Sequence, residues 1–579
     1  MLKTIKRRQA TQQHLMALNS LSPILQHIYA ARGVSDIAEL DKALSALLPY
    51  NTLKDIDKAV NCLADKLIQQ KRILIVGDFD ADGATSTAVA VSALQAFGAQ
   101  HVDFLVPNRF EYGYGLTPEI VEVASQWQPD LIITVDNGIS CVRGVAAAHQ
   151  KGIEVLVTDH HLPGDELPEA VAIVNPNQQG CQFPSKQLAG VGVIFYVMLA
   201  LRRYLQNQNY FTEHTIDIPN MAQFLDLVAL GTVADVVPLD KNNRILVHQG
   251  LSRIRAGHCR PGILALLSVA KREMSKLQAS DLGFAVAPRL NAAGRLDDMS
   301  LGINCLLAED PAQAELMAQQ LDQLNIERRA IEKEMQDQAM LALEQLHLNH
   351  ETLPPALCLY EENWHQGVIG ILAGRIKDKI HRPVAAFAKG DPGELKGSAR
   401  SIMGIHIRDV LQNISAKHPH LMKKFGGHAM AAGLSLAEEN LQTFADIFQQ
   451  EVKAQIAEQD LIAEIATDGA LSVNELNFDF VELLQNAGPW GQQFPEPTFD
   501  GIFDIIEQRL VGQNHLKLVL SLPSSPFQVN AIAFNVDTQQ WPNYKCKQIE
   551  AVYRLDINEY KGFKSVQLMV EYLQPIERS

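Results

Sequence analysis

Five short apolar runs, each followed by a segment of helical character, are the feature that most limits what this chain can fold into. The runs are rich in Val, Ile and Leu, as buried strands are, and the intervening segments carry helix formers, as in TPEIVEVASQW. Strands that alternate with helices are typical of a parallel sheet covered on both faces. The sequence therefore predicts an α/β domain over residues 55–235, with strands at 72–78, 101–107, 131–136, 154–159 and 170–176.

The rest of the 579-residue chain predicts an N-terminal arm and three further parts, so the expected fold class is multidomain α/β. Residues 1–54 contain short helical segments with breaks. Residues 236–350 are helical and end in a long amphipathic stretch, which we expect to link two domains, although a partner-binding coiled coil has the same pattern. A smaller α/β unit is expected at 351–457. Alternating strands at 458–579, such as LKLVLSL and VNAIAFNV, predict an antiparallel OB-like β-barrel.

Composition and charge narrow the class of protein without identifying a substrate. No apolar run is long enough to cross a membrane. Seven scattered cysteines without a C-x-x-C pair argue for a reducing cytoplasm and against a zinc or disulfide framework. The net charge of −16 neither supports nor excludes a polyanionic substrate, because clustered basic residues or bound cations offset charge locally. We expect a cytoplasmic protein with no membrane contact.

The first strand ends in GDFDADG, where Asp78, Asp80 and Asp82 alternate and Gly83 follows. An EF-hand calcium loop begins in the same way. Such a loop needs a bidentate Glu at its twelfth position, which is Val89 here, and an entering helix, whereas the residues before Asp78 predict a strand. The calcium loop is therefore disfavoured. We expect the three carboxylates at the carboxyl end of a strand, where open α/β sheets bind ligands.

Other segments of the same domain carry further metal-binding side chains. LIITVDNG ends a strand with Asp136, EVLVTDHH supplies Asp159, His160 and His161, and LVALGTVADVVPL places Asp235 in an apolar context. Parallel strands bring their carboxyl ends to one edge of the sheet, so residues more than 150 positions apart can meet there. Several carboxylates with one or two imidazoles and no thiolate suit Mn²⁺ or Mg²⁺. The ligands exceed the needs of one ion, which predicts a two-metal site with a shared carboxylate.

Each of these residues alone has an ordinary structural explanation. A single Asp at a strand end is usually a turn or helix-cap residue, and a His pair is more often structural than metal-binding. Their occurrence together favours a catalytic site that hydrolyses a phosphodiester or a phosphoanhydride. We expect Asp136 to bridge the ions, and His161 or Asp159 to orient His160 or to handle a proton.

Eight motifs together give the chain a specific resemblance to a known family. They are GDFDADG, VDNG, TDHH, GTVADVVPL, PRLNAAGR, WHQGVIG, GSARS and FGGHAMAAG. This set resembles the DHH phosphoesterase superfamily, and within it the bacterial single-strand-specific exonucleases with DHH, DHHA1 and OB-like domains. The superfamily's commoner first motif opens with a His, which this chain lacks. The resemblance covers about residues 50–579 and implies that two ions are held by Asp78, Asp80, Asp82, Asp136, His160 and Asp235.

The resemblance also implies a substrate-binding surface in the second α/β unit. Glycine-rich loops there offer backbone N–H groups to phosphate, although ordinary turn glycines would look similar. Ala399 stands where the family commonly has Gly, and Trp364 is a candidate for closing the cleft. The candidate binding residues are His365, Ser398, Arg400, Ser401, Gly427 and His428.

An exonuclease that works from one end needs a pocket for the terminal phosphate, and guanidinium groups pair bidentately with phosphate. The candidates are Arg109, Arg289 and Arg295, with Asn291 in the same segment as the last two. Phe110, Tyr112 and Tyr114 lie beside Arg109 and are candidates for stacking on bases. A structural aromatic turn would explain them equally well.

The resemblance implies a 5′ to 3′ exonuclease for single-stranded DNA that uses two Mn²⁺ or Mg²⁺ ions in recombination and repair. It further implies a monomer that works with a single-strand binding protein and a RecQ-type helicase. Two other functions fit some of the residues. One is a DHH phosphoesterase for small substrates, which the linking helix and the barrel disfavour, because small substrates need no extended grip. The other is a strand-binding module with a vestigial site, which the intact set of candidate ligands disfavours.

Overall fold

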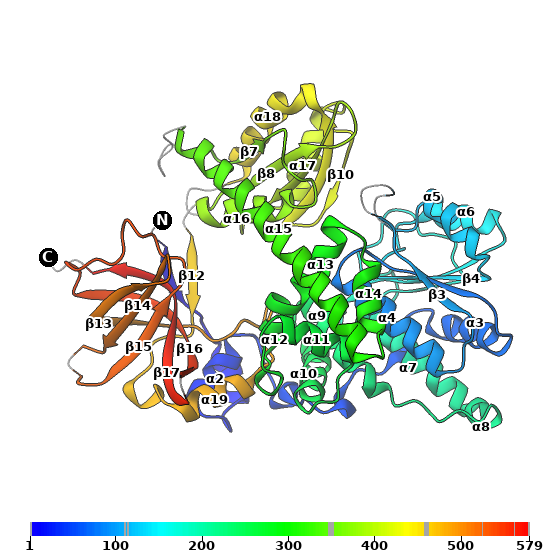
Figure 1. The fold of residues 1–579 in the computed structure, drawn as a ribbon, viewed down its shortest axis with the longest axis horizontal. Coiled ribbons are helices and arrows are strands. Elements are labelled where there is room, and N and C mark those ends of the chain that lie inside the picture. The colour runs from blue at the N-terminus through cyan, green and yellow to red at the C-terminus, as the bar shows by residue number, and fades with distance from the viewer. Residues whose placement is uncertain are drawn as a thin grey trace.

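The computed structural model describes residues 3–108, 112, 115–345, 353–456, 463–523, 525–560 and 562–576. Figure 1 shows a parallel-sheet domain, a central helical region, a second α/β unit and a C-terminal barrel. The predicted multidomain α/β class is confirmed, including the long connecting helix and the OB-like barrel.

The first domain is built on a five-stranded parallel sheet with the order β3-β2-β4-β5-β6. Alternate side chains of β2 and β4 enter two different cores, because successive residues of a strand point to opposite faces. Helices α3, α4 and α7 cover one face, and α5 and α6 cover the other. The strands are β2 (Ile73–Val76), β3 (Val102–Leu105), β4 (Leu131–Val135), β5 (Glu154–Thr158) and β6 (Ala172–Val174). The helices are α3 (Ile56–Ile68), α4 (Ala81–Ala96), α5 (Pro118–Ala124), α6 (Val142–Gln150) and α7 (Gly190–Asn207).

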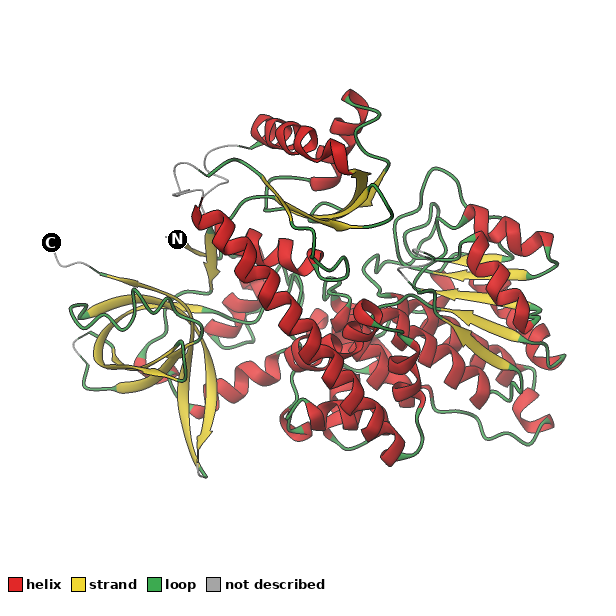
Figure 2. Cartoon of the chain, turned by 45° about the horizontal axis from the view of Figure 1, so that its top comes forward, coloured by secondary structure: helices red, strands yellow, loops and turns green. Residues whose placement is uncertain are grey.

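The central region is helical, as predicted. A five-residue π-helical turn, η7 (Leu282–Val286), interrupts it between two α-helices. The last helix, α15 (Pro311–Gln345), extends from the other helices to the second α/β unit, as Figure 2 shows. Arg375 of that unit donates a hydrogen bond of 3.0 Å from Nε to Glu332 of α15. The other helices are α8 (Tyr210–Glu213), α9 (Leu225–Ala234), α10 (Lys241–Arg255), α11 (Pro261–Val269), α12 (Ala279–Asp281), α13 (Ala287–Leu296) and α14 (Ser300–Leu307).

The second α/β unit has a mixed sheet with the order β10-β11-β9-β8-β7, in which only the β7–β8 pair is parallel. GSARS and FGGHAMAAG were expected to form loops, and that expectation is wrong for most of both. The first four residues of GSARS end strand β9, and Ala399 is buried in the sheet, opposite Ala432. FGGHAMAAG begins in β10 and ends in β11, with only residues 428–430 between the two strands. The strands are β7 (Leu357–Tyr360), β8 (Val384–Lys389), β9 (Glu394–Arg400), β10 (Lys424–Gly427) and β11 (Ala431–Ala437). The helices are α16 (Ile369–Ile380), α17 (Ile407–Lys417) and α18 (Leu441–Gln455).

The C-terminal part is a closed barrel with the order β13-β14-β15-β17-β16. All neighbouring pairs along this order are antiparallel except β15–β17, which is parallel. The strands are β13 (Phe499–Val511), β14 (His515–Ser521), β15 (Gln528–Ala533), β16 (Gln548–Tyr560) and β17 (Phe563–Pro575), and α19 (Phe478–Ala487) packs against the last two. The sequence patterns omit β13, because charged residues interrupt its apolar alternation.

The N-terminal arm contains helices α1 (Gln12–Ala17) and α2 (Pro23–Ala30), as expected, and also a strand that was not expected. That strand, β1 (Thr4–Arg7), pairs in parallel with β12 (Glu464–Thr467), beside the barrel. Arg32 forms two hydrogen bonds to Asp468, of 2.7 and 2.9 Å, and both side chains are almost fully buried. The start of the chain is therefore fastened to the segment that leads into the barrel.

Candidate metal centre

The loop after β2 positions the three aspartates of GDFDADG against the first turn of α4. Asp80 is the N-cap of this helix, and its Oδ1 accepts hydrogen bonds of 3.0 Å from the backbone N–H groups of Asp82 and Gly83. Asp78 is buried, and its Oδ1 accepts a bond of 2.8 Å from Phe79 N. A Cβ on Gly83 would lie 2.5 Å from the Asp78 carbonyl oxygen, so the loop folds back onto the helix only with glycine there.

Asp82 links α4 to the start of α7. Its carboxylate accepts hydrogen bonds of 2.6 Å from Gly190 N and 3.0 Å from Val191 N, at the positive end of the α7 dipole. Burial and the negative charge of Asp80 both disfavour the ionised carboxylate, and they outweigh the two hydrogen bonds that favour it. The pKa of Asp82 is therefore raised to about 7.

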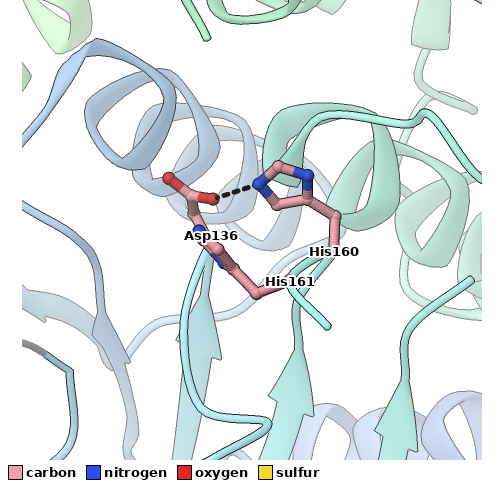
Figure 3. Close-up of side chains that lie close together, drawn as sticks. All are labelled: Asp136, His160 and His161. Atoms are coloured by element: carbon pink, nitrogen blue, oxygen red, sulfur yellow. Dashed lines mark ion pairs between the residues drawn. The ribbon is translucent and has the colours of Figure 1, made fainter. Parts of the chain in front are cut away.

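Asp136 and His160 meet at the carboxyl ends of β4 and β5. Asp136 has a backbone φ of 61°, a left-handed conformation that Asp tolerates better than most residues. His160 Nε2 lies 3.1 Å from Asp136 Oδ1, the contact drawn in Figure 3, and 3.5 Å from Asp235 Oδ2. One imidazole nitrogen thus lies between two carboxylates that are 99 positions apart in sequence.

Asp235 reaches the site from the end of a helix and not from the end of a strand, which differs from the expected arrangement. It is the C-cap of α9, whose sequence LDLVALGTVA is apolar enough to resemble a strand. Val236 follows with φ of 61° and is 60% exposed. This conformation is strained for a β-branched residue, and such strain concentrates at functional sites.

Two glycines that the sequence analysis missed make room for the cluster. A Cβ on Gly190 would lie 2.6 Å from Asp136 Oδ1, and a Cβ on Gly231 would lie 2.8 Å from Asp82 Oδ1. Gly231 stands inside the apolar helix α9, and Gly190 is the first residue of α7. An isolated glycine in an apolar helical pattern indicates close approach of another group, and this signal could have identified Gly231.

The electrostatics of the cluster fit a bound cation. Burial first, and then the neighbouring carboxylates, raise the pKa values of Asp136 and Asp235 well above the ordinary value. Burial and the nearby His161 lower the pKa of His160 to about 4, so its imidazole is neutral at neutral pH, as a metal ligand must be. A divalent cation bound among these carboxylates and the neutral imidazole would offset the repulsion between the buried negative charges.

Ligand atoms lie within 4.8 Å of one another in three overlapping groups, which together contain all six predicted metal ligands and also His161. The groups are Asp136–His160–His161, Asp82–His160–Asp235 and Asp78–Asp80–Asp136. Asp136 and His160 each occur in two groups. The residues therefore fit one or more divalent ions, and the oxygen-rich donor set suits Mn²⁺ or Mg²⁺.

Asp159 and His161 form a pair beside the cluster. Asp159 Oδ1 lies 2.8 Å from His161 Nδ1 and also accepts a bond of 2.7 Å from His160 N, while Oδ2 accepts one of 2.9 Å from Ile139 N. Burial alone would lower the pKa of His161, but the bond to Asp159 and its charge raise it to about 9. The same bond, against the effect of burial, lowers the pKa of Asp159. In the metal-free protein, these shifts favour an imidazolium bonded to a carboxylate at neutral pH.

The second α/β unit faces this pair through His428, whose ring is stacked at 6.5 Å on the ring of His161. Gly427, just before it, has φ of 146°, and a Cβ there would lie 2.4 Å from the Ala431 carbonyl oxygen. The hairpin that carries His428 therefore requires glycine at this position.

Arg400 and Ser398 also belong together, with Arg400 Nη1 2.9 Å from Ser398 Oγ. Gly370 allows this pair to approach α16, since a Cβ there would lie 2.8 Å from Arg400 Nη2. Ser401 is buried, and its Oγ donates a bond of 2.8 Å to the Ile405 carbonyl. This bond gives Ser401 a role in the turn after β9.

PRLNAAGR forms most of helix α13, and its polar side chains have protein partners. Asn291 Oδ1 accepts a bond of 2.8 Å from Ala81 N, in the first turn of α4. Arg289 forms an ion pair of 2.8 Å with Asp322 of α15. Arg295 donates a bond of 3.1 Å to the Gly367 carbonyl, and His365 Nδ1 accepts a bond of 3.1 Å from Gly367 N. The substrate roles of these residues remain predictions.

The predicted phosphate pocket and stacking residues around Arg109 are only partly visible. Arg109, Phe110 and Tyr114 lie outside the described residues. Tyr112 is half-buried and packs against the core under α5 and α6. Trp364 is buried, and its Nε1 donates a bond of 2.9 Å to Gln338 of α15. These contacts favour structural roles for Tyr112 and Trp364.

No helix within the described part of the chain has the length and apolar character needed to span a membrane.

Comparison with known proteins assigns each of the three folded units. Residues 72–232 match the N-terminal domain of the DHH family, residues 353–454 match the DHHA1 domain, and residues 467–572 match the RecJ OB domain. The chain is 53% identical over 556 residues to the single-stranded-DNA-specific exonuclease RecJ of Escherichia coli (strain K12), covering 96% of both chains. It is 54% identical to the protein of the same name from Dickeya dadantii, over 96% of this chain and 97% of that protein.

Solved structures agree with the sequence comparison. The crystal structure of RecJ in complex with Mn²⁺ from Thermus thermophilus is similar over 99% of this chain and 80% of that chain, with a TM-score of 0.79 and 30% identity. The Mg²⁺ complex of RecJ from the same organism gives a TM-score of 0.74 over 99% of this chain and 78% of that chain, with 28% identity. Because it matches the DHH, DHHA1 and RecJ OB domain models and is 53–54% identical to curated members over almost its whole length, the chain belongs to the RecJ family of single-stranded-DNA-specific exonucleases.

Proposed function

We propose that this protein is a divalent-metal-dependent exonuclease that degrades single-stranded DNA from 5′ to 3′ by hydrolysing phosphodiester bonds, in DNA recombination and repair. The observation that carries the proposal is the position of His160 Nε2 between Asp136 and Asp235 in a buried, acidic cluster. The names of the relatives support the substrate, and the Mn²⁺ and Mg²⁺ complexes of the T. thermophilus protein support the choice of ions.

Two ions, Mn²⁺ or Mg²⁺, would be held by Asp78, Asp80, Asp82, Asp136, His160 and Asp235. When bound, such ions lower the pKa of a water molecule, polarise the phosphoryl oxygen and stabilise the leaving oxygen. Asp136 and His160 each belong to two of the three ligand groups, and Asp136 is the better candidate for the shared ligand because its carboxylate offers two oxygens. Asp82 and Asp80 are oriented by backbone N–H groups, so their carboxylates are fixed before any ligand arrives.

His161 would act on the proton and the charge of the reacting phosphate. Asp159 holds it as an imidazolium beside His160, and from there it can donate a proton to the leaving oxygen or neutralise the developing charge. Arg400, Ser398 and His428 would bind the phosphate from the second α/β unit. The stacking of His428 on His161 supports a substrate held between the two units.

We further propose that residues 55–235 are the DHH catalytic domain, 236–350 the connecting helices, 351–457 the DHHA1 substrate-binding domain and 458–579 the OB-like domain, with 1–54 as the N-terminal arm. The protein would act as a cytoplasmic monomer on single strands released by a RecQ-type helicase and covered by a single-strand binding protein.

The test is digestion of single-stranded DNA, duplex DNA, short RNA and a cyclic dinucleotide by the purified protein in Mn²⁺ or Mg²⁺. We expect mononucleotides from single-stranded DNA, and a fluorophore at the 5′ end should be released before one at the 3′ end. Release from the small substrates alone would refute the proposal. Asp136→Ala should abolish hydrolysis and leave strand binding largely intact.

A further inference from the structure

We propose that Phe284 is a base-stacking site for single-stranded DNA, beside the metal centre. The inference rests on the proposed function, because it names a contact that this substrate would make. Phe284 lies in the π-helical turn η7 and is 86% exposed, the highest exposed fraction among the large hydrophobic residues described in the structure. An exposed phenyl ring adds nothing to the core, and π-helical turns are rare and frequent at functional sites.

Two features of neighbouring residues place η7, the turn that carries Phe284, near the metal centre. A Cβ on Gly283, the preceding residue, would lie 3.1 Å from Val233 Cγ1, and Val233 is two residues before Asp235. On the other side, η7 runs directly into α13, where Asn291 is bonded to Ala81 at the start of α4. Phe284 is seven positions before Asn291, which at the helical rise corresponds to roughly 10 Å.

Phe284 also belongs to the part of the helical region that adjoins the barrel. In Figure 1, α12, which leads into η7, lies on the side of the helices nearest the barrel. Lys276, just before α12, forms an ion pair of 3.1 Å with Glu559 near the tip of the β16–β17 hairpin. A strand that passes from the barrel to the metal centre would therefore run past η7.

Stacking is the kind of contact that suits this place. The nearby cluster is rich in carboxylates, which repel the phosphates of a strand that carries no bound cations. A phenyl ring instead binds the π-face of a base, without regard to charge or sequence. Val236, which is 60% exposed directly after Asp235, adds apolar surface on the same end of α9.

The test uses the full chain and a 3′-labelled oligothymidylate, with binding measured by fluorescence anisotropy in EDTA and nucleotide release measured in Mn²⁺. Phe284→Ala should weaken binding about 5-fold or more, the usual effect of losing one stacked base. Phe284→Trp should retain the affinity and Phe284→Leu should not, because the contact requires an aromatic face. Trp127→Ala is the control and should bind like the parent, since Trp127 is an exposed aromatic residue at the opposite end of the first sheet from the metal centre, where its carbonyl accepts a bond from Arg72 just before β2.

A series of oligonucleotides with one abasic position then identifies the contact. The difference between Phe284→Ala and the parent should vanish when the missing base is the one that stacks on Phe284. Equal binding by the parent, Phe284→Ala and Phe284→Leu would overturn the inference and favour a protein partner for this ring. A parent protein that binds the strand but releases no nucleotides would instead refute the proposed function. The nucleotide-release assay therefore tests the proposed function, and the binding assay tests the role of Phe284 separately.

Discussion

Asn291 Oδ1 accepts a hydrogen bond of 2.8 Å from the backbone N–H of Ala81, and so joins the central helices to the first turn of α4. Helix α13 also approaches the loop closely one turn further along, where a Cβ on Gly294 would lie 1.7 Å from the Phe79 carbonyl oxygen. Helix α13 therefore supports the loop that carries Asp78, Asp80 and Asp82.

Asn291→Ala should lower the free energy of unfolding by about 1 kcal/mol, because it removes an acceptor from an otherwise unpaired helix-start N–H. It should also weaken Mn²⁺ binding, measured by calorimetry, because the loop loses its support. Asn220→Ala is the matched control, since Asn220 caps η5 (Met221–Phe224) in the same way, at the far end of α9 from Asp235. Unchanged metal affinity in Asn291→Ala would contradict a supporting role.

Asp235→Asn should have opposite effects with and without metal. In EDTA it should raise the free energy of unfolding by on the order of 1 kcal/mol, because it removes one charge from a buried, mutually repelling cluster. In Mn²⁺ the parent should gain more stability than the variant, because the variant has lost a ligand. Thermal melts in both conditions check this, and a variant that is less stable than the parent in EDTA would contradict the repulsion.

Gly190→Ala should displace Asp136, since the added Cβ would lie 2.6 Å from its Oδ1. We expect a loss of metal affinity of about 10-fold or more, typical of residues that position metal ligands. Gly374→Ala in α16 is the control, because no atom lies within 4 Å of the added Cβ. This control should gain roughly 0.5–1 kcal/mol of stability with no change in metal affinity. Equal metal affinity in the two variants would show that Gly190 is not needed for space.

Arg32→Ala should lower the free energy of unfolding by about 3 kcal/mol, because it leaves the buried carboxylate of Asp468 with Arg8 as its remaining charged partner. Urea denaturation followed by tryptophan fluorescence is a suitable measurement, since Trp490 stacks 6.0 Å from Tyr29 of α2. Lys6→Ala removes an exposed ion pair with Glu464 and should cost about 0.5 kcal/mol or less. A similar loss of stability in both variants would mean that burial does not determine how much the Arg32–Asp468 ion pair contributes to the free energy of unfolding.

The sequence was sufficient for the strands of the first sheet and for the grouping of most of the candidate metal ligands, since both depend on a simple rule of parallel topology. Asp235 shows the limit of that rule. Its apolar context is shared by a buried strand and a buried helix, and only packing against α4 and α7 distinguishes them. Asn291 and Arg289 show a second limit. The same polar groups bind a phosphate or a backbone group equally well, so residue type alone does not reveal the partner.

Two glycines have roles at the site that the sequence pattern did not reveal. Gly190 begins α7 and Gly231 lies within α9, and the close approach that each allows becomes visible only when the neighbouring carboxylate is located. The exposed Phe284 was missed for a similar reason, because a Phe in an apolar helical pattern predicts a core position.

The pairing of the N-terminal arm with β12 has a consequence for the order in which the protein is made. Arg32 is synthesised 436 residues before Asp468, and β1 precedes β12 by a still longer stretch of chain. Throughout translation of the catalytic domain, this arm therefore carries an unpaired strand edge and a guanidinium without its main counter-charge. The first sheet is complete in sequence before β12 is made, but the arm can pair with β12 only after most of the chain has been synthesised, which makes this pairing a late, non-local step of assembly.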